Sequence, residues 1–401
     1  MVKPALRRGW RDRNTVQFGV APAHAMVLGP VDTATGSFLD LLDGTRGLPL
    51  LREEARRMGL PDGHVDALLE RLAQAGLLDD ATGGGPAADA LRAKDKMLDR
   101  LRPDLGSLSV VMPEPGAAMA RLAARRSVRV QVRGAGRVGA VVAATLAGAG
   151  VGQVEVLDGG CAEPWDVAPG GLPAEAIGER RDKAVRRVVR EAAPDRPAHS
   201  GTSTGSQTGE PGLSLVILAP RDGLAAYVPD PASAEQFLFS GTPHLYAGVL
   251  EATGVVGPLV LPGETGCAGC MERGRMDRDP AWPRLLAQWR SGRTRRVPAC
   301  DLALAGTVAG LAAAHALAFV DGELPSSAGA RWEVSSPGLD WHARPVWEHP
   351  ACPCRGVDRA KGEYAAEEEG RHETMAWQQP SVDSDRQGHA ARLSGTWRAH
   401  V

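Results

Sequence analysis

The sequence predicts an α/β protein in which a small α+β domain precedes a larger domain with a mainly parallel sheet. Three observations lead to this prediction. Strands and helices alternate from residue 127 onward, a glycine-rich turn follows the first of these strands, and two cysteine pairs lie in the C-terminal half. Such alternation is typical of a sheet covered by helices. A chain of 401 residues can hold two or three domains of about 150 residues each.

Residues 1–80 predict a small winged-helix-like domain. Apolar residues recur at helical spacing along 63–75, after a Pro-Asp pair that can begin a helix. The other elements expected here are three short strands and two helices, at residues 5–10, 15–20, 24–28, 34–42 and 48–58.

The rest of the chain divides by composition. Residues 81–126 predict a linker with helices, comprising a Gly-rich turn at 81–86 and a charged helix at 87–101. The larger domain is expected at 127–355, with buried-type strands at 213–219 and 244–252 and a surface loop at 197–212. Residues 356–401 contain few apolar side chains and are expected to be disordered.

A glycine loop follows the strand predicted at residues 128–132. Gly134, Gly136 and Gly139 would let backbone amides approach a phosphate at the start of the next helix. Asp158 ends the following strand, where it could hold a ribose hydroxyl. The pattern is that of a Rossmann-like unit. Tight helix-to-sheet packing without a nucleotide is one alternative; a nicotinamide dehydrogenase is another, but no catalytic histidine or Tyr-Lys arrangement follows the loop.

The two cysteine pairs predict a structural zinc site. Zinc prefers four ligands in a tetrahedron, and a thiolate pair on a tight turn supplies half of them. The pairs here are Cys267 with Cys270, and Cys352 with Cys354. A reactive dithiol or unconnected free thiols are the alternatives, and the nearby His342 and His349 are less favoured as ligands than the cysteines.

Composition narrows the classes of partner and the compartment. A net charge of −2 gives no broad attraction to nucleic acid or to an anionic membrane. No apolar run of signal-peptide length begins the chain, and the clustered cysteines favour a reducing cytoplasm. The apolar residues 302–320 predict a buried helix rather than a membrane span.

Taken in order, these motifs resemble the ThiF family of ubiquitin-activating-like adenylyltransferases over residues 127–354. The N-terminal block is similar to the PqqD-related domain that binds leader peptides of ribosomally made natural products. Together they resemble the ThiF-like leader-peptide-binding partners of azole-forming and thiopeptide machinery. The residues that carry the ThiF resemblance are the glycine loop, Asp158, 254–262, the Cys267–Cys270 pair and 300–306.

The resemblance implies an ATP and magnesium site, which this sequence matches in part. Asp222 falls where the family has its magnesium-binding aspartate, and Arg181 stands where the family has a lysine. The family's Asn-Leu-Asn-Arg-Gln segment is replaced by residues 167–172, so the triphosphate arginine is missing. Cys300 aligns with a position that accepts sulfur or a thioester in some members; a packed thiol at a helix start is the other interpretation.

The resemblance also implies two functional hypotheses. In the first, the chain is a non-catalytic binding protein that recruits a precursor peptide to a separate cyclodehydratase or dehydratase. The leader would pair with the strand at 24–28, its apolar side chains entering a groove lined by Met26, Leu28 and Leu69. In the second, the chain is an ATP-dependent adenylyltransferase acting on a peptide or protein carboxylate. Family members commonly dimerise through the nucleotide domain, so a homodimer is expected.

Overall fold

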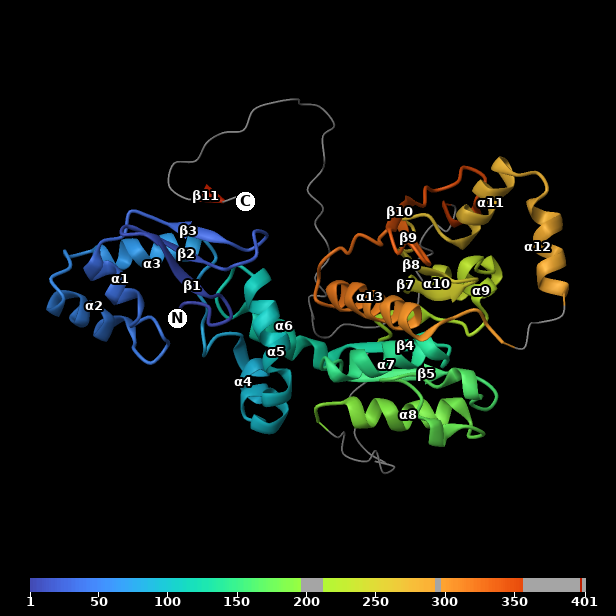
Figure 1. Ribbon diagram of the computed structural model, residues 1–401, viewed down its shortest axis with the longest axis horizontal. Helices are drawn as coiled ribbons and strands as arrows, with labels where there is room; N and C mark the ends of the chain where they lie inside the picture. The colour runs from blue at the N-terminus through green and yellow to red at the C-terminus, as the bar shows by residue number, and fades with distance from the viewer. Residues whose placement is uncertain (196–211, 293–296, 356–396, 399–401) are drawn as a thin grey trace, which may run out of the picture.

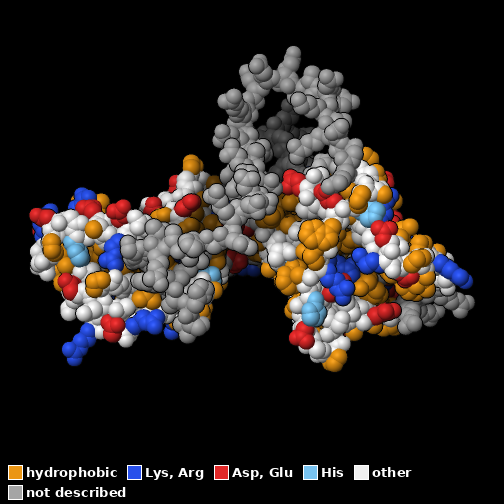
Figure 2. Space-filling model, turned by 90° about the horizontal axis from the view of Figure 1, so that it is seen from above, with side chains coloured by type: hydrophobic (Ala, Val, Ile, Leu, Met, Phe, Trp, Pro, Cys, Tyr) orange, Lys and Arg blue, Asp and Glu red, His pale blue; other side chains and the backbone are white. Residues whose placement is uncertain are grey.

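The computed structural model describes residues 1–195, 212–292, 297–355 and 397–398. Figure 1 shows two folded parts joined by a group of helices. The surface loop predicted at 197–212 and the disorder predicted for 356–401 fall almost entirely outside the described residues. Acidic and basic side chains are interspersed over the face seen in Figure 2, with no large field of one sign.

The N-terminal part contains the predicted three strands and three helices. Its sheet has the order β1-β2-β3-β11, and every ladder in it is antiparallel. Asp32 caps the first helix by accepting a 2.7 Å hydrogen bond from the amide of Thr35. The elements are β1 (Arg8–Asp12), β2 (Thr15–Phe18), β3 (Met26–Leu28), α1 (Thr33–Leu39), α2 (Leu48–Arg57), α3 (His64–Gln74) and β11 (Trp397–Arg398).

The connecting region differs from the single charged helix predicted at 87–101. The structure has α4 (Gly85–Arg92), α5 (Asp95–Val111), α6 (Ala117–Ala124) and the short η1 (Arg125–Ser127) instead. The helix breaks because Leu91 of α4 and Leu101 of α5 both belong to a core shared with α6, and a turn is needed to bring both against it. This region also holds the N-terminal part, since the buried Lys3 donates a 2.5 Å hydrogen bond to the carbonyl of Met112.

The larger part is built on a seven-stranded sheet with the order β10-β9-β8-β7-β6-β4-β5. Strands β5, β4, β6 and β7 are parallel neighbours, which confirms the Rossmann-like prediction. Strands β8, β9 and β10 extend the sheet in antiparallel fashion, and as strands they were not predicted. The strands are β4 (Arg129–Arg133), β5 (Gln153–Leu157), β6 (Leu215–Leu218), β7 (His244–Leu250), β8 (Thr253–Val260), β9 (Ala330–Ser335) and β10 (Trp341–Pro345).

Helices cover both faces of this sheet. Because side chains alternate along a strand, Leu215 and Ile217 enter the core shared with α7 and α13, whereas Val216 packs beneath α10. The helices are α7 (Arg137–Gly148), α8 (Arg181–Ala192), α9 (Gly223–Tyr227), α10 (Pro231–Phe239), α11 (Ala268–Arg278), α12 (Trp282–Ser291) and α13 (Leu302–Val320). Short 3₁₀ turns are η2 (Pro164–Asp166), η3 (Ala174–Ala176) and η4 (Pro353–Arg355).

Helix α13 is long and apolar enough to cross a membrane by length and composition alone, and among the described residues no other helix is. One side of it, including Val308, Ala309 and Ala312, is fully buried in the main core against the sheet. A core helix of a globular domain passes the same test of length and composition, so this packing agrees with the predicted buried helix.

Candidate functional site

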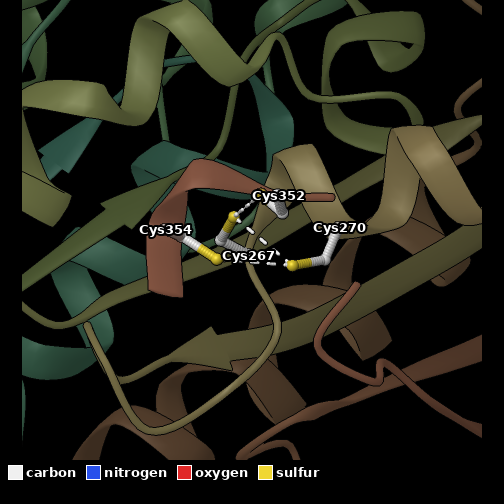
Figure 3. Close-up of side chains that lie close together, drawn as sticks. All are labelled: Cys267, Cys270, Cys352 and Cys354. Carbon is white, nitrogen blue, oxygen red and sulfur yellow. Dashed lines mark hydrogen bonds between the residues drawn. The ribbon is translucent and has the colours of Figure 1, made fainter. Parts of the chain in front are cut away.

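The four clustered cysteines meet at one place, although 82 to 87 residues separate the two pairs along the chain. Cys267 precedes α11 and Cys270 lies in its first turn, while Cys352 and Cys354 come from the segment around η4 (Figure 3). Their four sulfur atoms all lie within 4.8 Å of one another, and three of the four residues are buried. None is in a disulfide.

The spacing of these sulfurs suits a tetrahedral metal. Zinc–sulfur bonds of about 2.3 Å place the sulfurs of a tetrahedron about 3.8 Å apart. The contacts here are 3.8 Å from Cys267 to Cys270, 3.7 Å from Cys267 to Cys352 and 3.5 Å from Cys270 to Cys354. The hydrogen bond between Cys267 and Cys270 lowers the pKa of the Cys270 thiol and raises the pKa of the Cys267 thiol. The donor set is therefore compatible with zinc.

The nearby histidines lie outside the cysteine cluster. His349 Nε2 lies 2.8 Å from a carboxylate oxygen of Asp277, and His349 Nδ1 accepts a hydrogen bond from the amide of Ala351. His342 lies on the exposed strand β10. Among the described residues, the group that could hold a metal ion contains the four cysteines and neither histidine.

The glycine loop joins β4 to α7, and its three glycines have different neighbours. Gly134 has a φ of +113°, and a side chain there would overlap the carbonyl oxygen of Ala219 at the end of β6. A side chain at Gly139 would overlap the carbonyl oxygen of Gly134. Both glycines are thus required by close packing of the loop. A Cβ on Gly136 would instead lie 3.4 Å from Cγ of Arg221, a side chain that can move.

Asp158 lies at the end of β5 beside this loop, as predicted, but both its carboxylate oxygens already have partners. Oδ2 accepts a 2.6 Å hydrogen bond from the amide of Ala135, and Oδ1 accepts one of 3.0 Å from Nε of Arg181. Arg181, the first residue of α8, also donates to the carbonyls of Gly159 and Cys161. The two predicted residues are therefore brought together, as an ion pair with each other.

The structure adds a cluster that the sequence did not reveal. Arg221, in the turn after β6, donates a 2.6 Å hydrogen bond to Asp166 and a second to Glu163, and it lies over the ring of Trp165. Asp166 is 2% exposed, and burial raises the pKa of its carboxyl to about 6. No local signal marks these residues, because 55 and 58 positions separate Arg221 from its two carboxylate partners.

The cavity in front of the glycine loop is too small for a nucleotide as the side chains lie. Its volume is about 30 Å³, and its lining includes Gly136, Arg137, Asp166, Arg221 and Cys300. Sites for small-molecule ligands and cofactors typically have volumes of roughly 300–1,000 Å³. The space directly in front of the loop is therefore closed to the phosphates of ATP in this arrangement, whereas a second cavity, of about 590 Å³, is lined by Asp158.

Two further predicted residues have distinct surroundings. The Asp222 side chain is outside the lining of this cavity; it caps α9 by accepting a 3.0 Å hydrogen bond from the amide of Leu224. Cys300 lies at the edge of the cavity, its carbonyl accepts a 2.6 Å hydrogen bond from Arg137, and burial raises the pKa of its thiol. A raised pKa disfavours the thiolate and agrees with the interpretation of a packed thiol.

The predicted peptide edge lies in the N-terminal part. Met26 and Leu69 are half-buried at the margin of its core. Leu28 is 2% exposed and lies within that core, so as the side chains lie it cannot line an open groove because its surface is already covered. On the side of β3 away from β2, the backbone pairs antiparallel with β11, Trp397 opposite Val27 and Arg398 opposite Met26 (Figure 1).

Comparison with known proteins places the chain in a family. The profile of the ThiF family matches residues 112–355. The E. coli protein MccB, solved with AMPCPP and selenomethionine MccA, is similar with a TM-score of 0.64 and 14% identity, over 89% of this chain and 99% of that one. MccB with ATP gives a TM-score of 0.62, also at 14% identity and over the same shares of the two chains.

A second protein shares this fold. PaaA has a TM-score of 0.60 and 15% identity, over 86% of this chain and 100% of that one. No curated protein matches the sequence. The family profile covers more than half of the chain, including the glycine loop and all four clustered cysteines. The chain therefore belongs to the ThiF family.

Proposed function

We propose that this chain is a binding protein that recruits the leader of a ribosomally made precursor peptide. Its N-terminal part would hold the leader and present the remainder to separate modifying enzymes of azole or thiopeptide type, such as a cyclodehydratase or dehydratase. Tethering of this kind raises the local substrate concentration without any chemistry in the tether itself.

The observation that carries the proposal is the outer edge of β3. A short segment, β11, pairs with this edge in an antiparallel ladder, so the edge accepts an added strand. Strand addition is one of the common ways of binding an extended peptide, with backbone hydrogen bonds for affinity and side-chain pockets for selectivity. We assign Met26 and Leu69, which are half-buried at the margin of the core, to such a pocket. The similar fold of MccB, a microcin C7 biosynthetic enzyme solved with its partner MccA, supports a peptide substrate.

The test is a fluorescence anisotropy titration of the full chain with a labelled leader from a precursor encoded beside it. We expect saturable binding that an unlabelled leader displaces. Absence of saturable binding at protein concentrations up to the solubility limit would contradict the proposal. We also propose that the four cysteines hold a structural zinc, that the protein acts in the cytoplasm and that it forms a homodimer.

A second candidate is an ATP-dependent adenylyltransferase acting on a peptide carboxylate. The glycine loop and Asp158 favour it, together with the similarity to MccB solved with ATP. Pyrophosphate exchange into ATP, measured with and without the precursor peptide, separates the two candidates. Exchange that depends on the peptide would establish the enzyme; leader binding without exchange supports the recruitment protein.

A further inference from the structure

Arg221 lies across the mouth of the glycine loop. Its Cγ is 3.4 Å from where a Cβ of Gly136 would lie, and its guanidinium continues to Asp166 and Glu163. The ring of Trp165 lies 5.8 Å from the guanidinium carbon. One arginine side chain thus connects the loop that would hold a phosphate with the segment around η2.

The inner end of this connection is fixed. Asp166 is almost fully buried, and its second oxygen accepts a 2.9 Å hydrogen bond from the amide of Glu163 and lies 3.5 Å from Arg181. The outer end is more exposed: the Glu163 side chain is 41% exposed and also accepts a hydrogen bond from the amide of Asp166 in a capping box. Arg221 is therefore paired with one buried carboxylate, that of Asp166, and with one accessible carboxylate, that of Glu163.

This arrangement leaves little free space in the cleft and pairs the Arg221 guanidinium with carboxylates. The remaining space of about 30 Å³ can hold about one water molecule. The Arg221 guanidinium is already compensated by two carboxylates in charge-assisted hydrogen bonds. Arg137, which also lines the cleft, donates to the carbonyl of Cys300. An incoming anion would have to displace Glu163 and move Arg221 before it could reach the backbone of the loop.

We propose that Arg221 is an internal latch that keeps the glycine-loop cleft closed, and that releasing it opens a site for the phosphates of a nucleotide. The closed cleft lies in the larger part of the protein, apart from the peptide edge, so this inference does not depend on the proposed function. It identifies one side chain, rather than loss of the loop itself, as the barrier to nucleotide binding.

Isothermal titration of the full chain with ATP and with inorganic pyrophosphate tests the latch. We expect wild type to bind both weakly, and Arg221→Ala to bind at least about tenfold more tightly, because the apparent affinity rises with the fraction of molecules whose site is open. Arg190→Ala is the matched control. Arg190 lies on α8, its one side-chain hydrogen bond within the described residues is to the backbone of Arg186, and its loss should leave affinity unchanged. Arg221→Ala without any gain would overturn the latch, as would wild type binding ATP as tightly as the variant.

Loss of Arg221 leaves the buried Asp166 with one cation fewer, so the variant could be unstable. The double variant Arg221→Ala with Asp166→Asn removes that charge and should fold and bind the nucleotide; a folded double variant without gain also overturns the latch. Leader binding measured on the same proteins keeps the two ideas separate. If the leader does not bind wild type, the recruitment function alone is wrong. If Arg221→Ala has the same nucleotide affinity as wild type, the latch alone is wrong.

Discussion

Arg125 and Asp321 form a doubly hydrogen-bonded ion pair across 196 positions of the chain. Nε and Nη2 of Arg125 donate to the two carboxylate oxygens of Asp321 at 2.8 and 2.6 Å, and each side chain is only 5% exposed. Arg125 also donates to the carbonyl of Ala149. The pair joins the end of the connecting helices to the end of α13 and so fixes the larger domain against the preceding helices.

Arg125→Ala should destabilise the protein strongly. The substitution leaves Asp321 buried without its cation, and breaking a buried pair in this way costs about 3–5 kcal/mol of unfolding free energy. Chemical denaturation monitored by tryptophan fluorescence measures this loss. Arg102→Ala is the matched control, because Arg102 pairs with Asp99 in a bridge whose side chains are 73% and 60% exposed. A loss from Arg125→Ala no larger than that of the control would show that the buried pair adds nothing to stability.

The parts of the fold that were predictable from the sequence have local signals. Gly134 and Gly139 lie five residues apart in one loop, and close packing there excludes any side chain at either position. Asp158 directly follows a strand with an apolar pattern. The cysteine pairs were equally visible because each pair is short in sequence. The antiparallel strands β8 to β10 were missed as strands: β8 is buried almost throughout and so lacks alternation, and β10 is exposed almost throughout.

The state of the cleft was not predictable, for a physical reason. Arg221 and Glu163 are residue types that usually lie at the surface, and only the fold brings them together. The sequence resemblance gave Asp158 and Arg181 as separate nucleotide contacts, whereas the structure pairs them with each other. The sequence therefore predicted where these charged residues lie in the fold, but it did not predict which residue each of them pairs with.

Zinc removal should unfold the region around the four cysteines. Each purified chain is expected to contain about one zinc ion, because a closed four-cysteine site binds one, and Cys354→Ser should lower the zinc content and the melting temperature together. Elemental analysis and thermal unfolding measure the two effects. Cys161→Ser is the control, since Cys161 is exposed and outside the cluster. Full zinc content in Cys354→Ser would contradict a four-sulfur site.

Shortening Met26 or Leu69 should weaken leader binding without unfolding the domain. Both side chains are half-buried at the margin of the core, so Met26→Ala and Leu69→Ala would remove surface of the proposed pocket. We expect each to raise the dissociation constant by about tenfold, or about 1.4 kcal/mol. Leu50→Ala removes an apolar side chain of α2 that is 46% exposed and serves as the control. Equal losses from all three variants would place the peptide elsewhere.

The stability contributed by Asp166 should depend on pH between about 4 and 6. Burial raises the pKa of this carboxyl from 3.8 to about 6 against the attraction of Arg181 and Arg137, while the charge of Asp158 also raises it. The folded state then binds the proton more tightly than the unfolded chain, so the contribution is complete below pH 4 and is lost as pH rises through 6.

Asp166→Asn fixes the neutral form and isolates this effect. Wild type should gain stability relative to the variant as pH falls from 7 to 4, by at most about 3 kcal/mol for a shift of about two pKa units. Urea denaturation of both proteins at several pH values gives the difference directly. A difference of the opposite sign would mean that the guanidinium groups of Arg181 and Arg221, with their hydrogen bonds to Asp166, outweigh burial and keep the carboxylate ionised. In that case acid would destabilise the cluster, and the anchor of Arg221 would be strongest at neutral pH.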